Sequence, residues 1–126
     1  MKAVLFFIVP ILVGIAAADT SQHFAHDQVL DKLDAIKDDY RISINGRQAQ
    51  NPSEILAALK KLDWLSAHHS SPTKRISVEI SDDSCIRLQL ARDSGNPREY
   101  WVFYPRYFIT KSNEVGRIVT PLFDAY

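Results

Sequence analysis

The sequence predicts a small α+β domain: an N-terminal helix, a strand and a capped helix, followed by an antiparallel β-meander of about four to five strands. Apolar residues recur at helical spacing in two segments of the first half of the chain, and they alternate with polar residues through much of the second half. The later connections are too short for crossover helices, so successive strands are expected to be antiparallel. Helices and strands are also segregated along the chain, which favours a helix packed on one face of the sheet.

The first helix is expected to follow a loose tail. Residues 19–26 are polar apart from Phe24, and free termini stay disordered unless they pack against the domain. Beyond the tail, apolar residues at helical spacing face a row of charged residues, which indicates an amphipathic helix. Its apolar residues are Val29, Leu30, Leu33 and Ile36. The single α+β domain is therefore predicted to span 27–126.

A short strand comes next. Tyr40, Ile42 and Ile44 alternate with polar residues until the pair Asn45-Gly46, which suits the positive φ angles of a tight turn. The sequence therefore predicts a strand that ends in a turn at this pair.

The second helix is predicted over 52–62. Asn51 is placed to cap it, Pro52 suits its first position, and Glu54 is placed to complete a capping box. Its buried stripe is expected to contain Ile55, Leu56, Leu59 and Leu62. Residues 64–73, which are rich in serine, are expected to form a loop.

The rest of the chain is predicted to be β-structure. The expected strands occupy 75–80, 86–90, 100–104, 107–110 and 115–120. Asp82-Asp83 is interpreted as a hairpin turn rather than as a pair of catalytic or calcium-binding carboxylates, because aspartate favours turns. The strand at 100–104 is apolar on both faces, which predicts a central position in the sheet. Pro105 is expected to end that strand, because proline has no N–H to donate to the ladder.

The first eighteen residues have the pattern of a secretory signal peptide. Lys2 supplies a positive start, Ala3 to Ile15 is an uncharged apolar run, and Ala16-Ala17-Ala18 matches the A-x-A cleavage pattern. A retained membrane anchor needs about 20 apolar residues, and this run is shorter. We therefore expect cleavage between Ala18 and Asp19, export to a periplasm or the outside, and no membrane contact after cleavage.

Charge and cysteine content further narrow the functional class of the protein. The chain has 15 basic and 15 acidic residues, so loss of Lys2 with the signal peptide leaves 14 against 15 and a net charge near −1. Nucleic-acid binding then lacks its main electrostatic source, and no nucleic-acid partner is expected. Cys85 is the only cysteine, which excludes an internal disulfide. We expect it to be a buried, inert strand residue.

The sequence contains no signature of a hydrolytic nucleophile, base and orienting group. Adjacent histidines in a serine-rich loop are usually solvated, and no second ligand cluster reinforces His68 and His69. We therefore assign no catalytic residue, no metal ligand and no cofactor. The alternative is a small exported hydrolase or metal-dependent enzyme that uses His68 and His69.

The favoured function is a non-enzymatic binding, accessory or inhibitor module. Residues 100–108 hold six aromatics. Strand alternation places Tyr100 and Tyr104, with Arg106, on the face opposite Trp101 and Phe103. Tyrosine and arginine are frequent at interfaces, so Tyr100, Tyr104 and Arg106 are the predicted binding residues for a protein or polymer partner. The competing interpretation is that these aromatics are core residues, because β propensity alone favours them.

The run from Ile42 to Gly46, through Leu62 and on to Asp82, is similar to the strand–helix–strand run of periplasmic domains in the biopolymer-transport family that powers outer-membrane uptake. Members of that family also have a retained transmembrane helix with an intramembrane acidic residue, which Ala3 to Ile15 lacks. Hairpins are also predicted here where that family has a helix. We therefore carry over no function from the resemblance and assign no family.

Overall fold

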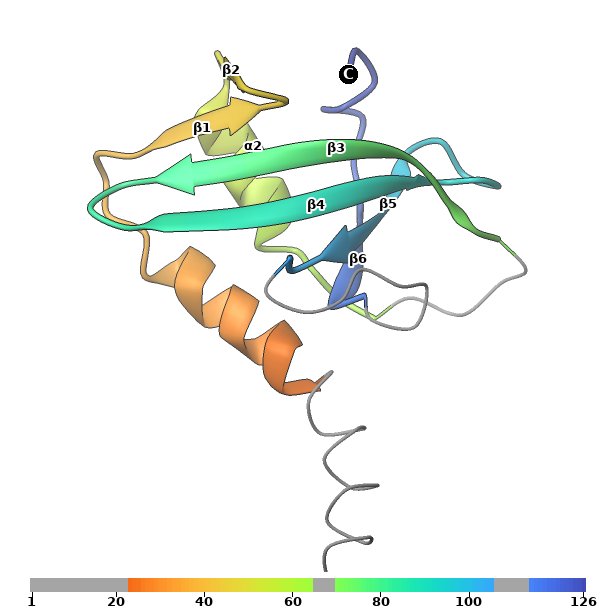
Figure 1. The fold of residues 1–126 in the computed structure, drawn as a ribbon, viewed down its shortest axis with the longest axis horizontal. Coiled ribbons are helices and arrows are strands. Elements are labelled where there is room, and N and C mark those ends of the chain that lie inside the picture. The colour runs from red at the N-terminus through yellow and green to blue at the C-terminus, as the bar shows by residue number, and fades with distance from the viewer. Residues whose placement is uncertain (1–22, 65–69, 106–113) are drawn as a thin grey trace, which may run out of the picture.

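The fold is a six-stranded antiparallel sheet with two helices on one face (Figure 1). A computed structural model describes residues 23–64, 70–105 and 114–126. Its sheet has the order β2-β1-β3-β4-β5-β6. The strands are β1 (Arg41–Ile44), β2 (Arg47–Gln48), β3 (Pro72–Ser81), β4 (Cys85–Asp93), β5 (Glu99–Phe103) and β6 (Gly116–Val119). The predicted α+β class with an antiparallel meander is confirmed, and β5 has strands on both sides, as expected.

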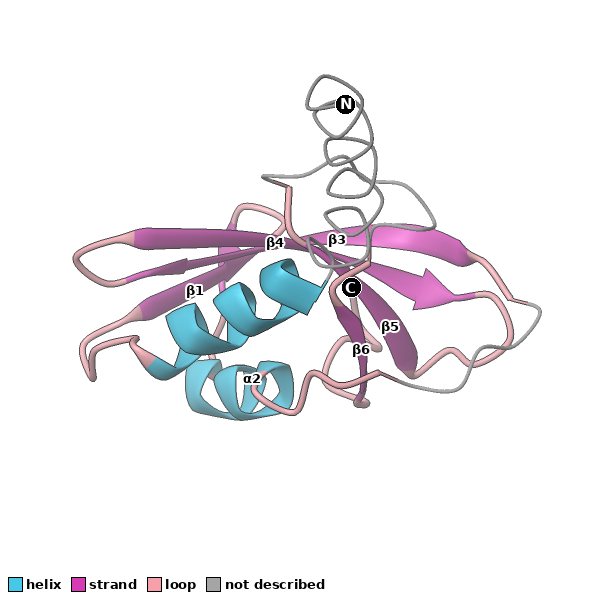
Figure 2. Ribbon diagram, turned by 90° about the horizontal axis from the view of Figure 1, so that it is seen from below, coloured by secondary structure: helices cyan, strands magenta, loops and turns pink. Residues whose placement is uncertain are grey.

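Both helices lie on the same side of the sheet (Figure 2). Helix α2 (Pro52–Leu59) follows β2, and residues 23–34 belong to the N-terminal helix. None of the helices within the described ranges is long and apolar enough to cross a membrane. The main core fills the space between helices and sheet, and its members alternate along the strands as predicted. Its strand residues are Ile42, Ile44, Ile76, Val78, Ile80, Ile86, Leu88, Leu90, Tyr100, Val102 and Ile118.

The opposite side of the sheet, which we call the open face, carries the alternate residues of the same strands. On β1, β3 and β4 it is formed by Arg41, Ser43, Arg75, Ser77, Glu79, Arg87 and Gln89, and on β5 by Trp101 and Phe103. The polar residues of this face are exposed or half-buried, whereas both aromatic residues are buried. The open face therefore has a polar part and an apolar part.

Two predicted turns form as expected and tie neighbouring elements together. Asn45 and Gly46 adopt φ angles of 52° and 83°, and the Asn45 side chain accepts a hydrogen bond from the Ser77 amide at 2.9 Å. At the β3–β4 turn, the carboxylate of Asp82 accepts hydrogen bonds from the amides of Lys37 at 2.9 Å and Ser84 at 2.8 Å. These backbone donors lower the pKa of Asp82 to about 2. The turn thus also holds the end of the N-terminal helical segment.

The N-terminal helix begins earlier than predicted. Residues 23–26, assigned to the loose tail, are helical, and Ala25 and His26 are buried. The His26 ring stacks on Trp64 at 4.9 Å, and its Nδ1 hydrogen-bonds to the carbonyl of Val115. Packing against distant segments therefore orders a stretch that was expected to be part of the loose tail. The predicted signal peptide and residues 19–22 lie outside the described residues.

Helix α2 is shorter than predicted and is capped differently. It ends at Leu59, although Leu62 is still buried. Asn51 occupies the N-cap position, but its side chain does not bond to the helix backbone. Its amide instead lies 3.5 Å from the carboxylate of Glu54, so the predicted capping box does not form. Pro52 at the first position and burial of Ile55 are the features that match the prediction.

The segment after α2 lies beside β6. Asp63 and Arg117 exchange backbone hydrogen bonds of 3.1 and 2.8 Å, which form an isolated bridge at this edge of the sheet. Gly116 has a φ of 142°, and a Cβ there would lie 2.8 Å from Leu62 Cδ1. This position therefore requires glycine on both conformational and steric grounds. The predicted strand at 115–120 corresponds to β6, while its expected partner at 107–110 lies outside the described residues.

Candidate functional site

The tyrosine face predicted to bind a partner is part of the core. Tyr100 is fully buried and Tyr104 is 9% exposed, both on the helix side of the sheet. The Tyr100 ring meets Phe123 edge-on at 5.4 Å, and its hydroxyl accepts a hydrogen bond from Arg92 at 3.1 Å. The Tyr104 hydroxyl accepts one from Lys32 at 2.9 Å. The competing interpretation, that these aromatics are core residues, is therefore confirmed for both tyrosines, and their use as an exposed binding face is ruled out. Arg106 lies outside the described residues.

Strand alternation separates the two aromatic sets as predicted, but the tyrosines face the helices and the other set faces the open side. Trp101 and Phe103 form a small cluster with Ala91 there, and each is at most 2% exposed. The guanidinium of Arg117 lies 3.9 Å from the centre of the Trp101 ring. That of Arg75 lies 5.8 Å from the Phe103 ring. Arginine side chains thus pack on the aromatic part of the open face.

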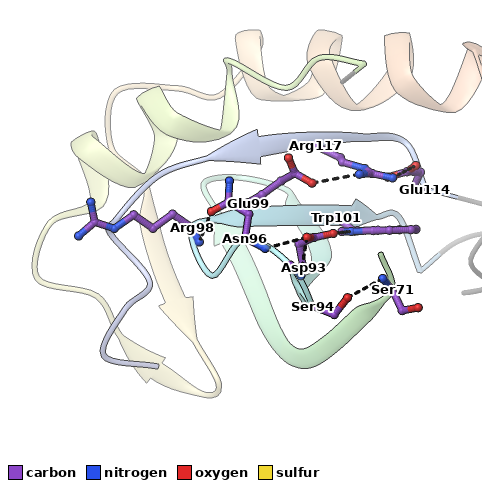
Figure 3. Close-up of polar contacts among 10 residues, drawn as sticks. Ser71, Asp93, Ser94, Asn96, Arg98, Glu99, Trp101, Glu114 and Arg117 are labelled. Carbon is purple, nitrogen blue, oxygen red and sulfur yellow. Dashed lines mark hydrogen bonds and ion pairs between the residues drawn. The ribbon is translucent and has the colours of Figure 1, made fainter. Parts of the chain in front are cut away.

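Arg117 is the centre of a buried ion-pair network on β5 and β6 (Figure 3). It donates from Nη1 to Glu99 at 3.0 Å, and from Nε and Nη2 to the two carboxylate oxygens of Glu114 at 2.9 and 3.2 Å. The Arg117 and Glu99 side chains are 6% and 5% exposed. Burial lowers the pKa of Arg117, but hydrogen bonds and charges from Glu114 and Glu99 outweigh it and raise that pKa. In the sequence, this network is indicated only weakly, by charged residues that flank short apolar strands.

Asp93 lies beside this network and is hydrogen-bonded to the indole N–H of Trp101 (Figure 3). It accepts hydrogen bonds from Trp101 Nε1 at 2.8 Å and from the amides of Gly95 and Asn96 at 2.9 Å each. Burial raises the pKa of Asp93, but the neighbouring Ser70 hydroxyl and these three donors together lower it to about 2. Its carboxylate therefore organises the turn after β4 and orients the indole ring.

Replacing Asp93 with asparagine is expected to remove a pH-dependent part of the stability. Because the pKa of Asp93 falls from 3.8 to about 2 on folding, its charged form stabilises the fold above pH 4, by about 2 kcal/mol. That contribution is lost as the pH falls from about 4 to about 2. Urea unfolding of D93N should therefore show a deficit at pH 7 that shrinks towards pH 2. D31N, which changes an exposed aspartate, is the control; an equal pH profile for both variants would contradict this account.

The polar part of the open face is pre-arranged by contacts within the sheet. Arg87 donates to Glu79 at 3.1 Å, and Arg75 donates to Gln89 at 3.3 Å.

Cys85, at the start of β4, is exposed, so the expectation that it is buried is wrong. It is a strand residue, as predicted, but it lies next to the hairpin turn and its side chain points away from the core.

The histidines proposed for the enzymatic alternative, His68 and His69, lie outside the described residues. Within the described parts of the chain, no three histidine, cysteine or carboxylate side chains are grouped to hold a metal ion. His23 and His26 both pack on Trp64, at 5.6 and 4.9 Å between ring centres. These two histidines therefore contribute to the attachment of the N-terminal helix.

Comparisons with known proteins supply no relative from which a function could be inferred, so the functional interpretation rests on the geometry described above. No family model, curated protein or solved structure matches the chain. Two features remain for a functional interpretation: the buried network around Arg117, and the exposed polar part of the open face. In the first, Arg117 is paired with two carboxylates and is buried, whereas the second presents side chains to solvent.

Proposed function

We propose that the protein is an exported, non-enzymatic binding or accessory module that holds a protein or polymer partner on the open face of its sheet. The observation that carries the proposal is the asymmetry of the sheet. Helices cover one face (Figure 2), while β1, β3 and β4 present exposed and half-buried polar side chains on the other. The proposed surface thus replaces the tyrosine face, which the core occupies.

The rigidity of this surface supports the proposal. Strands β3 and β4 are paired from Ser81–Cys85 to Pro72–Asp93, and the core residues beneath them are almost fully buried. Glu79 and Gln89 hold the guanidinium groups of Arg87 and Arg75 in place. A partner that binds here therefore meets donors that have already lost part of their conformational freedom, which reduces the entropy lost on binding.

The single cysteine permits a site-specific test. Cys85 is exposed on the open face, so a photoreactive maleimide attached to it samples that surface in the otherwise unmodified protein. The matched control carries the same group on the helix side, at Ala57→Cys in a Cys85→Ser background, because Ala57 is exposed on α2. Both labelled proteins are incubated with the native exported fraction, irradiated and analysed by mass spectrometry.

We expect one dominant adduct from the Cys85 position and none from the helix-side position. Prior addition of excess unlabelled protein should suppress that adduct, because both forms compete for the same partner. Adducts from the helix-side position alone, or no competable adduct from either position, would contradict the proposal. Matching thermal unfolding curves for the two labelled proteins confirm that both are folded.

A further inference from the structure

We infer that the open face recognises an acidic segment of a partner protein through the guanidinium groups of Arg41, Arg75 and Arg87. The inference rests on the proposed function, and it specifies the chemistry of the partner. All three arginines are exposed and belong to three neighbouring strands, β1, β3 and β4. They form an arginine triad that points away from the helices.

The solvent-accessible charges of the molecule are unevenly distributed between its two sides. On the open face they are the three arginines of the triad and one carboxylate, Glu79, whereas Asp93, Glu99 and Arg117 on the same face are buried. The chain as a whole has equal numbers of acidic and basic residues, so this positive excess is balanced elsewhere. Residues 27–39, on the helix side, contain five aspartates and two lysines, and the aspartates are all exposed. This separation steers an acidic partner to the sheet and away from the helices.

The guanidinium groups are available for a partner. Within the described residues, the side chain of Arg41 makes no hydrogen bond or ion pair, and the side chain of Arg75 has the neutral side chain of Gln89 as its hydrogen-bond partner. Arg87 is paired with Glu79, but its side chain is 75% exposed. A carboxylate is therefore able to approach all three arginines without breaking a buried interaction. Arginine suits this task because its planar fork binds both oxygens of a carboxylate.

The spacing of the triad fits an extended peptide. Arg87 lies opposite Glu79, and Arg75 is four residues from Glu79 along the same strand. The two arginines are therefore separated by about 14 Å along the strand direction, which is the length of four extended residues. A segment with acidic residues at positions i and i+4 meets both arginines, while Ser77 and Gln89 lie between them as hydrogen-bond partners.

A nucleic acid is a poorer fit for the same surface. Nonspecific nucleic-acid binding depends on many cations that track a continuous phosphate backbone. Here the carboxylate of Glu79 lies beside Arg87 and repels such a backbone, whereas an acidic peptide places charges only where the arginines are. The arrangement therefore favours separate carboxylates over a continuous polyanion.

The test is fluorescence anisotropy with a labelled peptide that has glutamates at i and i+4, and with its glutamine counterpart. The variant R41Q/R75Q/R87Q removes the triad, and R47Q/K60Q/K61Q removes the same charge from exposed residues elsewhere. We expect the wild-type protein to prefer the glutamate peptide and to lose affinity as salt increases. Loss of the two ion pairs to Arg75 and Arg87, together with the nearby charge of Arg41, should weaken binding roughly tenfold, whereas the control triple variant should stay within about twofold.

Three results would overturn the inference: equal affinity for the glutamine peptide, equal loss in both triple variants, or a single-stranded oligonucleotide binding as tightly as the glutamate peptide. Its failure is separable from failure of the proposed function. If the Cys85 crosslinker captures a partner but the glutamate peptide does not bind, only the inference of an acidic partner segment is wrong. If the partner is captured from the helix side, both that inference and the proposed function are wrong.

Discussion

Replacing Arg117 with methionine is expected to lower the free energy of unfolding by about 3–5 kcal/mol. Methionine fills much of the volume of the arginine stem, but it removes the cation that Arg117 presents to the carboxylates of Glu99 and Glu114. Both carboxylates lie in poorly solvated surroundings, with side-chain exposures of 5% and 15%. Urea unfolding followed by tryptophan fluorescence measures the change directly, because Trp101 packs against Arg117.

Two further variants identify the cause. R117K keeps the charge but loses the fork that binds Glu114 through two donors, so an intermediate loss is expected. Combining R117M with E99Q and E114Q removes the two negative charges together with the cation and should restore part of the stability. If R117M alone changes the free energy of unfolding by less than about 1 kcal/mol, the buried network does not stabilise this part of the sheet.

Replacing Tyr100 with alanine is expected to destabilise the protein by about 3–5 kcal/mol, because it opens a cavity between the sheet and the C-terminal segment. The ring is fully buried and contacts Phe123. Y100F keeps the ring and removes only the hydroxyl that accepts a hydrogen bond from Arg92, so a loss of about 1 kcal/mol is expected. Chemical denaturation of both variants tests this order.

The variants Y100A and Y100F also test where the proposed partner binds. S77A, on the exposed open face, is the control and should change the free energy of unfolding by less than about 0.5 kcal/mol. If Y100A were as stable as the wild-type protein but failed to capture the partner, Tyr100 would be a surface residue and the tyrosine face would be the binding surface after all. A large loss of stability would instead confirm its place in the core.

Local patterns account for most of the elements. Alternation at Ile76, Val78 and Ile80 predicted β3, and Asn45-Gly46 predicted the first turn, because both patterns report preferences within a few residues. The two-residue strand β2 and the early start of the N-terminal helix were not predicted. Both depend on pairing or packing with segments far along the chain, as the stacking of His26 on Trp64 shows.

The candidate site was predicted less well for a related reason. Alternation correctly separated Tyr100 from Trp101, but it contains no information about which face other elements will cover. Phe123 and the N-terminal helix cover the tyrosine side, and they are distant in sequence from β5. The contact of Glu99 with Arg117 likewise requires β5 and β6 to pair before the two charges meet.

The amino-acid sequence by itself determined the α+β class, the turn positions, the alternation of each strand and the lack of an internal disulfide, because these follow from short-range periodicity and composition. The tertiary structure decided that Tyr100 and Tyr104 are core residues, that Cys85 is exposed, and that three arginines from separate strands share the open face. Side chains from different strands become neighbours only through sheet register, and a face becomes core only when another element covers it.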